Sequence, residues 1–406
     1  MRQPLVLLHR WFGLFIAVFL FVSGLTGAVI SWDHELDEWL NPRFYHSSST
    51  GDPQSTLALA AQVEAADPRI RVTYAPLAVE PGHALNLSVE PRVDPTTGQL
   101  YDVDYNEVAL DPASGKIQGK RMWGAVSLSR ENLLPFLYKL HYSMHIPDGW
   151  GMEIGVLFMG IVGIVWAIDS GIALWLSFPN RRAWRKSFAF RWRERGYKLN
   201  FDLHRSGGVW VWLLLLTLAI TSVSMNLGQQ VMRPLVSTIS SLTPSPFDTR
   251  TPAPLEKPVE PSITPERSVE LAIAAARARG WQTPAGAVFY SSMYGVYGVG
   301  FFAPGQDHGD GGLGNPWLYF DAGSGQSVGA EIPGTGSAGD IFMQAQFPLH
   351  SGRIIGVPGR IVVSLMGLLV ATLSLTGLII WAKKRAARVR SSRVRKPHPS
   401  EFAGNI

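Results

Sequence analysis

Four long apolar stretches constrain the fold of this chain more than any other feature. An α-helix needs about 20 apolar residues to cross the roughly 30 Å of hydrocarbon in a bilayer. Three stretches reach this length without a charged residue, and the fourth is interrupted only by Asp169. They cover 11–32, 154–178, 207–227 and 361–382. We therefore predict a membrane protein with a bundle of four transmembrane helices.

These stretches divide the chain into membrane and polar parts. The predicted transmembrane helices occupy 9–33, 141–178, 205–227 and 350–384. The polar parts between and after them are two large outer segments, a basic loop and a basic tail, at 34–140, 228–349, 179–204 and 385–406. A removable signal peptide has an apolar core of only about 7 to 15 residues. The first stretch is longer, so we interpret it as a retained membrane anchor.

The composition excludes several kinds of chemistry. The chain contains no cysteine, which excludes disulfides, thiolate-bound iron–sulfur clusters, a cysteine nucleophile and covalent attachment of a c-type haem. No phosphate-binding glycine loop and no His-Glu-x-x-His sequence stands out. Histidine is then the remaining strong nitrogen or sulfur ligand for a transition metal, and the chain has 10 histidines.

Basic residues gather beside one set of helix ends. The amino terminus, the 179–205 connection and the tail after Ala382 together hold 19 Lys and Arg but only three acidic residues. Loops rich in Lys and Arg remain on the cytoplasmic side of a membrane. We therefore predict that both termini and the basic loop are cytoplasmic and that the two outer segments are periplasmic. The same pattern explains the basic charge without a nucleic-acid partner.

Landmarks in the first half of the chain recur in the second half at nearly constant offsets. The matched pairs are His9-Arg10 with His204-Arg205, Asp111–Gly115 with Asp321–Gly325, Leu140-His141 with Leu349-His350, and Ser170-Gly171 with Thr376-Gly377. Their order indicates a duplicated unit consisting of a span, a small outer α+β domain and a second span. Such parallel repeats are related by an axis along the membrane normal.

Four of the matched positions are histidines, and they form one pair at each membrane surface. His9 and His204 fall at the inner ends of the first and third spans. His141 and His350 fall at the outer ends of the second and fourth. Two facing imidazoles suit the axial positions of a haem iron, which helix bundles commonly hold. The alternatives are histidines that reach the lipid headgroups, or a zinc site, although zinc prefers three or four clustered ligands.

Further candidates lie near these pairs. His145 follows His141 by one helical turn, so it either competes with His141 as the outer ligand or supports it. His34 is expected to line the outer site or to be exposed. Asp169 is the one ionisable residue deep in a span, which makes function the default hypothesis. We predict that Asp169 takes part in proton movement or stabilises the inner haem site.

Two sets of residues have less specific interpretations. The span glycines leave room for a macrocycle or allow close helix packing; they include Gly24, Gly160, Gly171, Gly367 and Gly377. The histidines without a matched partner are interpreted as surface residues, and they are His46, His83, His308 and His398.

At these residues the sequence resembles the PepSY-associated transmembrane family. The resemblance rests on the stretches at 9–14, 23–27, 111–117, 349–356 and 375–381. Within the family, the chain resembles FoxB-type ferrisiderophore reductases. This implies a bacterial inner-membrane protein with two PepSY-like periplasmic domains and two haem b groups. It also implies a ferric siderophore as substrate, here expected to be a hydroxamate, and a quinol or a cytoplasmic reductase as electron donor.

Two classes of function remain open. The first is a ferric-chelate reductase that passes electrons across the membrane, with His34 and Asp169 as the candidate catalytic residues. The second is a non-redox membrane anchor whose outer domains bind a periplasmic peptide or protein. The paired histidines favour the reductase, whereas only the resemblance of the outer domains favours the anchor.

Overall fold

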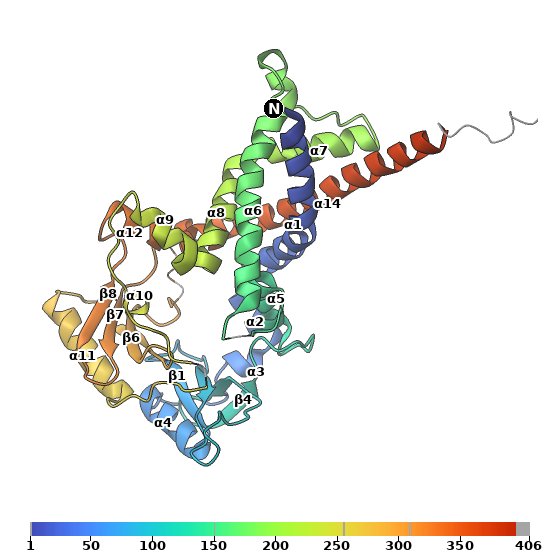
Figure 1. Ribbon diagram of the computed structural model, residues 1–406. Helices are drawn as coiled ribbons and strands as arrows, with labels where there is room; N and C mark the ends of the chain where they lie inside the picture. Colours follow the sequence, from blue (N-terminus) through green and yellow to red (C-terminus); the bar gives the residue numbers. More distant parts are fainter. Residues whose placement is uncertain (1, 150, 255, 308, 310, 395–406) are drawn as a thin grey trace, which may run out of the picture. The chain divides into compact units, whose positions relative to one another are not determined.

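The computed structural model describes residues 2–149, 151–254, 256–307, 309 and 311–394, and the chain forms two compact units. The first unit comprises the described residues of Met1–Ala28, Ile161–Ile220 and Leu365–Ile406 and contains helices only. The second unit comprises those of Val29–Gly160 and Thr221–Ser364 and contains every strand of the described chain (Figure 1).

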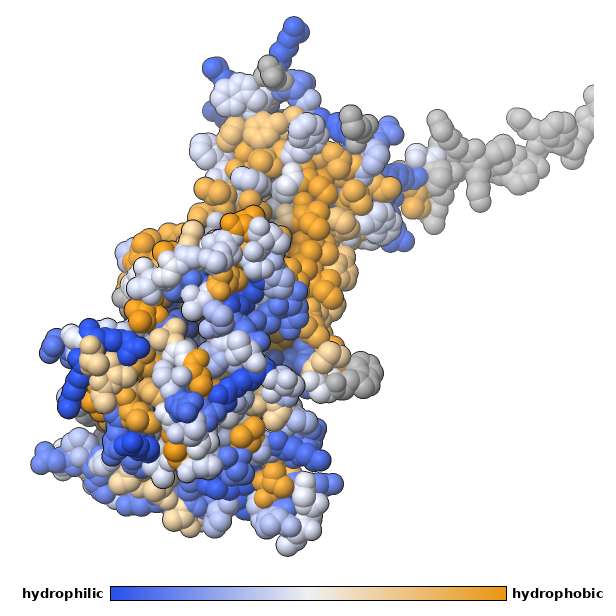
Figure 2. Space-filling view, turned by 60° about the vertical axis from the view of Figure 1, so that its left-hand side comes forward, coloured by the Kyte–Doolittle hydropathy of each residue, from blue (hydrophilic) through white to orange (hydrophobic). Residues whose placement is uncertain are grey.

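Four helical segments are long and apolar enough to cross a membrane, as the sequence predicts. They are α1 (Arg2–Ile30), α6 (Ile154–Ser177), the segment Trp212–Ser237 that begins with α8 (Trp212–Leu227), and α14 (Val357–Val394). Figure 2 shows a largely hydrophobic surface over these helices. Exposed side chains such as Val18, Ile161 and Leu365 contribute to it. Lipid covers such a surface in a membrane, so the chain is a multi-pass membrane protein.

Glycine allows two of these helices to touch. A Cβ atom on Gly24 of α1 would lie 2.5 Å from the carbonyl oxygen of Gly367 on α14, and the reverse substitution would give the same distance. Only a residue without a side chain permits this approach. At Gly160 of α6, the side chain of Leu227 fills the corresponding space. These three glycines therefore serve helix packing.

The predicted second span is two helices. α5 (Leu133–Ser143) contains His141 and is separate from α6. Met144 and His145 follow α5 with φ angles of 53° and 52°. This left-handed conformation is uncommon for residues other than glycine, and it ends α5 as glycine usually ends a helix. The expected helix 141–178 is therefore corrected, because His141 precedes the membrane-spanning helix and lies outside it.

The third and fourth predicted spans are also divided. In 205–227, a single residue, Val211, separates α7 (Tyr197–Trp210) from α8. In 350–384, α13 (Gln346–Ser351) ends at Gly352, which has a φ of +77°. A Cβ on Gly352 would collide with the backbone of Gly359, so this sharp connection into α14 requires glycine.

An antiparallel sheet of eight strands forms the centre of the second unit, in the order β4-β3-β2-β1-β5-β6-β7-β8. The strands of the first segment are β1 (Ile70–Pro76), β2 (Leu85–Pro91), β3 (Glu107–Leu110) and β4 (Ile117–Arg121). Those of the second are β5 (Ala285–Ser291), β6 (Val296–Phe301), β7 (Trp317–Asp321) and β8 (Ser327–Glu331). One helix precedes each set, α4 (Thr56–Ala66) and α11 (Pro265–Ala278).

The two sets of strands join edge to edge. β1 pairs with β5, with Tyr74 opposite Phe289 and Pro76 opposite Ala287. Each of these strands would otherwise expose unpaired backbone groups, and their pairing removes both open edges. The two α+β segments that the sequence predicts are therefore halves of one sheet.

Both helices contribute to one hydrophobic core. Leu85, Leu87 and Val89 alternate along β2 and are at most 3% exposed, as expected for a strand with one buried face. Leu59 of α4 and Ala272 of α11 belong to the same buried cluster. Burying each leucine side chain contributes about 1.5–3 kcal/mol. The remaining short α-helices are α2 (Asp33–Leu40), α3 (Pro42–Tyr45), α9 (Arg233–Ser237), α10 (Pro246–Thr249) and α12 (Ala338–Gln344).

Candidate functional site

The first predicted histidine pair comes together in the helical unit. His9 of α1 and His204 of α7 have ring centroids 6.2 Å apart. When two imidazoles bind one iron from opposite faces, their centroids are about 6 Å apart, because each nitrogen lies about 2.0 Å from the metal and roughly 1.1 Å from its ring centre. The spacing of this pair therefore fits a metal between the rings.

Each ring of this pair has a protein partner at its Nδ1 atom. The Nδ1 of His9 lies 2.9 and 3.0 Å from the two carboxylate oxygens of Asp169. The Nδ1 of His204 lies 3.0 Å from the carbonyl oxygen of Leu373 and 3.2 Å from the hydroxyl of Thr376. A metal-binding histidine usually donates its second ring nitrogen to a carboxylate or carbonyl. Such bonds place the proton on Nδ1 and the lone pair on Nε2.

Glycines leave space beside the inner pair. Gly13 and Gly208 each follow one of these histidines by four residues and so lie on the same helix face. A Cβ on Gly13 would meet nothing within 4 Å, and one on Gly208 would come only within 4.0 Å of Leu373. Helix packing therefore does not explain Gly13. Gly171 is exposed and lies two residues after Asp169, on another face of α6. The open space is consistent with a planar ligand beside the imidazoles.

The second predicted pair comes together in the other unit. His141 of α5 and His350 of α13 have ring centroids 6.1 Å apart. The hydroxyl of Thr221 lies 2.9 Å from the Nδ1 of His350. Thr221 is only 1% exposed, so this hydrogen bond fixes the orientation of the ring. The spacing again fits two axial ligands of one metal.

The two remaining candidates near the outer pair have other neighbours. The Nε2 of His145 donates to the carbonyl oxygen of Phe136 at 2.9 Å, and the two rings stack with centroids 4.6 Å apart. Of the two alternatives for the outer ligand, the structure therefore places His141 beside His350. His34 packs edge-on against Tyr45 at 5.6 Å and lines a separate cavity.

This cavity lies in the sheet-containing unit and has a volume of about 300 Å³. Its lining includes one arginine, Arg121, and several carboxylates: Asp33, Asp37, Glu80, Glu107 and Asp307. Neither member of the outer histidine pair is among its described lining residues. The cavity is therefore an acidic feature distinct from the histidine pairs.

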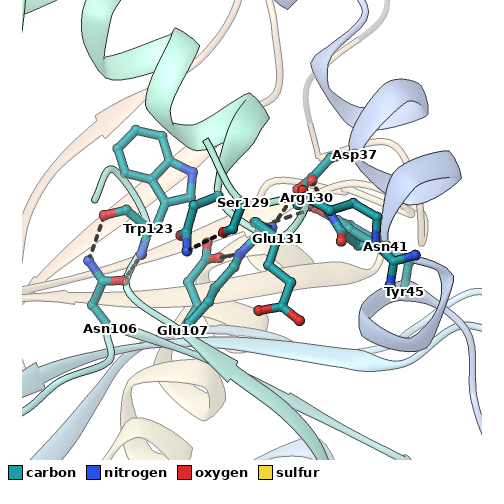
Figure 3. A network of polar contacts seen from close by, with 11 residues as sticks. Asp37, Asn41, Tyr45, Asn106, Glu107, Trp123, Ser129, Arg130 and Glu131 are labelled. Atoms are coloured by element: carbon teal, nitrogen blue, oxygen red, sulfur yellow. Dashed lines mark hydrogen bonds and ion pairs between the residues drawn. The ribbon is translucent and has the colours of Figure 1, made fainter. Parts of the chain in front are cut away.

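A buried ion-pair network forms one wall of the cavity (Figure 3). Arg121 of β4 binds Asp37 of α2 at 2.7 Å and Glu107 of β3 at 2.6 Å. It also donates to the carbonyl oxygen of Glu131 at 3.1 Å and stacks on the ring of Phe44. Burial raises the pKa of Glu107, and the guanidinium opposes this rise. Arg121 thus links α2 to β3 and β4 at the edge of the sheet.

The structure also groups three residues that no sequence pattern connects. Glu38, His46 and His83 place their donor atoms within 4.8 Å of one another. His46 and His83 were interpreted as isolated surface residues because neither has a counterpart in the other half. His308 and His398 lie outside the described residues.

Comparison with known proteins identifies the family. The profile of the PepSY-associated TM region matches residues 6–384. The chain belongs to this family. The match includes all four transmembrane helices and both histidine pairs. No curated protein sequence matches the chain.

Proposed function

We propose that this member of the PepSY-associated family is a haem b oxidoreductase of the bacterial inner membrane. It passes electrons to a ferric siderophore at the periplasmic surface and releases ferrous iron. The observation that carries the proposal is the pair of ring spacings, 6.2 Å for His9 and His204 and 6.1 Å for His141 and His350. These residues would be the axial ligands of two haem b groups.

The surrounding residues have defined tasks in this proposal. Asp169 accepts a hydrogen bond from His9, which orients the ring and makes its Nε2 a stronger electron donor. The carbonyl oxygen of Leu373 does the same for His204. Thr221 orients His350. Bound haem would supply one-electron transfer, which the side chains of this chain do not provide.

One two-electron donor reduces two ferric ions in the proposed reaction. A quinol, or a reduced cytoplasmic reductase, supplies two electrons, and the quinol releases two protons as it becomes a quinone. Each ferric ion takes one electron and becomes ferrous. Hydroxamate oxygens are hard ligands that hold the less highly charged ferrous ion more weakly, so reduction releases the iron.

The direction of transfer rests on topology. The 19 basic residues beside one set of helix ends support cytoplasmic termini, with the sheet-containing unit in the periplasm. We also propose that the two halves arose by duplication. Each half supplies one member of each histidine pair, and one helix followed by four strands occurs in both.

Purified protein reduced with dithionite should be reoxidised by a ferric hydroxamate. We expect a b-type visible spectrum and, in the presence of a ferrous-specific chelator, roughly two ferrous ions per chain, one for each haem. A gallium hydroxamate has the same shape but no accessible reduction, and it serves as the control. Absence of any haem band would favour the non-redox anchor. Reduced protein that no ferric chelate reoxidises would indicate another electron acceptor.

Replacement of Asp169 by Asn should leave both haems bound but slow turnover by about 10- to 100-fold, the usual effect of losing a ligand-orienting contact. The potential of the inner haem should rise, because a nearby negative charge no longer favours the oxidised state. Redox titration and turnover kinetics measure the two effects.

Ser170→Ala is the matched control for Asp169→Asn. The hydroxyl of Ser170 only donates to the carbonyl oxygen of Trp166 in its own helix, at 2.8 Å. Its removal should leave the potential and the rate unchanged. If Asp169→Asn has the wild-type potential of the inner haem and the wild-type turnover rate, the carboxylate serves packing only.

A further inference from the structure

A second group of ligating side chains lies in the sheet-containing unit, apart from both histidine pairs. Glu38 belongs to α2, His46 follows α3, and His83 precedes β2. The Nε2 atoms of both histidines lie 3.4 Å from the same oxygen, Oε1 of Glu38. Two imidazole nitrogens thus converge on one carboxylate.

The backbone holds the two histidines side by side. His46 and His83 form an isolated antiparallel bridge. The hydrogen bonds flank this pair, from the amide of Ala84 to the carbonyl of Tyr45 at 2.8 Å and from that of Ser47 to Gly82 at 2.9 Å. In such a non-hydrogen-bonded pair the opposing side chains are closest. The ring centroids are accordingly 5.5 Å apart.

The two distances to Glu38 match the edges of a metal coordination tetrahedron. A hydrogen-bonded ion pair between an imidazolium and a carboxylate is usually about 2.7–2.9 Å long, and the two contacts at Glu38 are longer, at 3.4 Å. Two ligands that each lie about 2.05 Å from a tetrahedral ion are roughly 3.4 Å apart.

We propose that Glu38, His46 and His83 bind a divalent transition-metal ion of the zinc type. Two imidazoles and one carboxylate form a donor set typical of zinc sites that keep an open position. Calcium and magnesium prefer oxygen ligands, so the two imidazoles disfavour them. The side chain of His46 is 50% exposed, which leaves room for water or an exogenous ligand as the fourth partner. The site does not depend on the proposed haem chemistry.

Zinc binding to the full-length protein in detergent tests this site. The protein is purified with its haem and stripped of loose metal with a chelator, and Zn²⁺ alone is then titrated by calorimetry. We expect one Zn²⁺ per chain that is lost, or bound at least 10-fold more weakly, in His46→Ala, in His83→Ala and in Glu38→Gln. X-ray absorption at the zinc edge should show two imidazole nitrogens at about 2.0–2.1 Å.

Two controls keep the result decisive. His398→Ala removes a histidine of the tail and should bind Zn²⁺ as the wild type does. The thermal unfolding midpoint shows whether each variant is folded, and because His46 is half exposed, His46→Ala provides a test even if His83→Ala unfolds. Unchanged zinc affinity in folded His46→Ala, or a zinc spectrum without imidazole ligands, would overturn the proposal.

Discussion

His204→Ala is expected to lose one of the two proposed haems and to retain the other. The substitution removes one axial nitrogen of the inner pair but leaves Asp169 and His9 in place. The outer pair, His141 and His350, belongs to the other compact unit and is unchanged by the substitution. A pyridine haemochrome assay should therefore give about half of the wild-type haem, with a single remaining redox transition.

Three companion experiments separate ligation from misfolding. Added imidazole should restore the second haem in His204→Ala, because it replaces the missing ligand in a folded site. His350→Ala should lose the other haem, with a different potential remaining. His145→Ala should keep both haems, since its Nε2 is bound to Phe136. Two haems in His204→Ala without added imidazole would refute the inner assignment.

Arg121→Met should destabilise the sheet-containing unit by about 3–5 kcal/mol, the cost of leaving buried charges without their partner. Asp37 and Arg121 are 4% and 7% exposed, so water does not replace the lost guanidinium. The pKa of Glu107 is already raised by burial and should rise further. Denaturant-induced unfolding monitored by tryptophan fluorescence measures the effect, which we expect as a large fall in the unfolding midpoint.

The exposed ion pair of Arg69 with Asp67, at 2.8 Å, provides the matched control. Water screens such a pair, so Arg69→Met should leave the midpoint almost unchanged. Adding Asp37→Asn and Glu107→Gln to Arg121→Met should recover part of the stability, because neutral amides cost less to bury than unpaired carboxylates. An Arg121→Met protein as stable as the wild type would show that the network contributes no net stability.

Hydropathy predicts the transmembrane helices because lipid imposes a length and a polarity on every spanning segment. It does not predict where they end. Met144 and His145 break α5 from α6 in a left-handed conformation without the glycine that usually signals it. Gly352 ends α13 in the same conformation and is a glycine. The predicted fourth span nevertheless begins at position 350, before this turn, because hydropathy alone does not show a turn.

Matched positions predict which histidines pair but not what holds them. A carboxylate in a span is costly, which marks Asp169 as a candidate. Its contact with His9, 160 positions away in the sequence, depends on how α1 and α6 are rotated about their axes. Glu38, His46 and His83 offered no signal, since no repeat marks them and the bridge that aligns them is a long-range backbone contact. The sequence does not predict that β1 pairs with β5 either. Every strand edge presents the same backbone N–H and C=O groups, so the sequence does not show which two edges will join.

Because the two halves share one sheet, the edge of β1 has no partner strand during part of synthesis. β1 ends at Pro76, and its partner β5 begins only at Ala285. At about 5–20 residues per second, ribosomes need roughly 10–40 s to make the intervening chain. Once β4 has been made, which ends at Arg121, a nascent first half with its four strands formed carries an open β1 edge for the rest of this interval. Such an edge can pair with another copy. The rate of elongation, rather than the stability of the finished protein, therefore sets how long each new molecule is exposed to strand exchange with its neighbours.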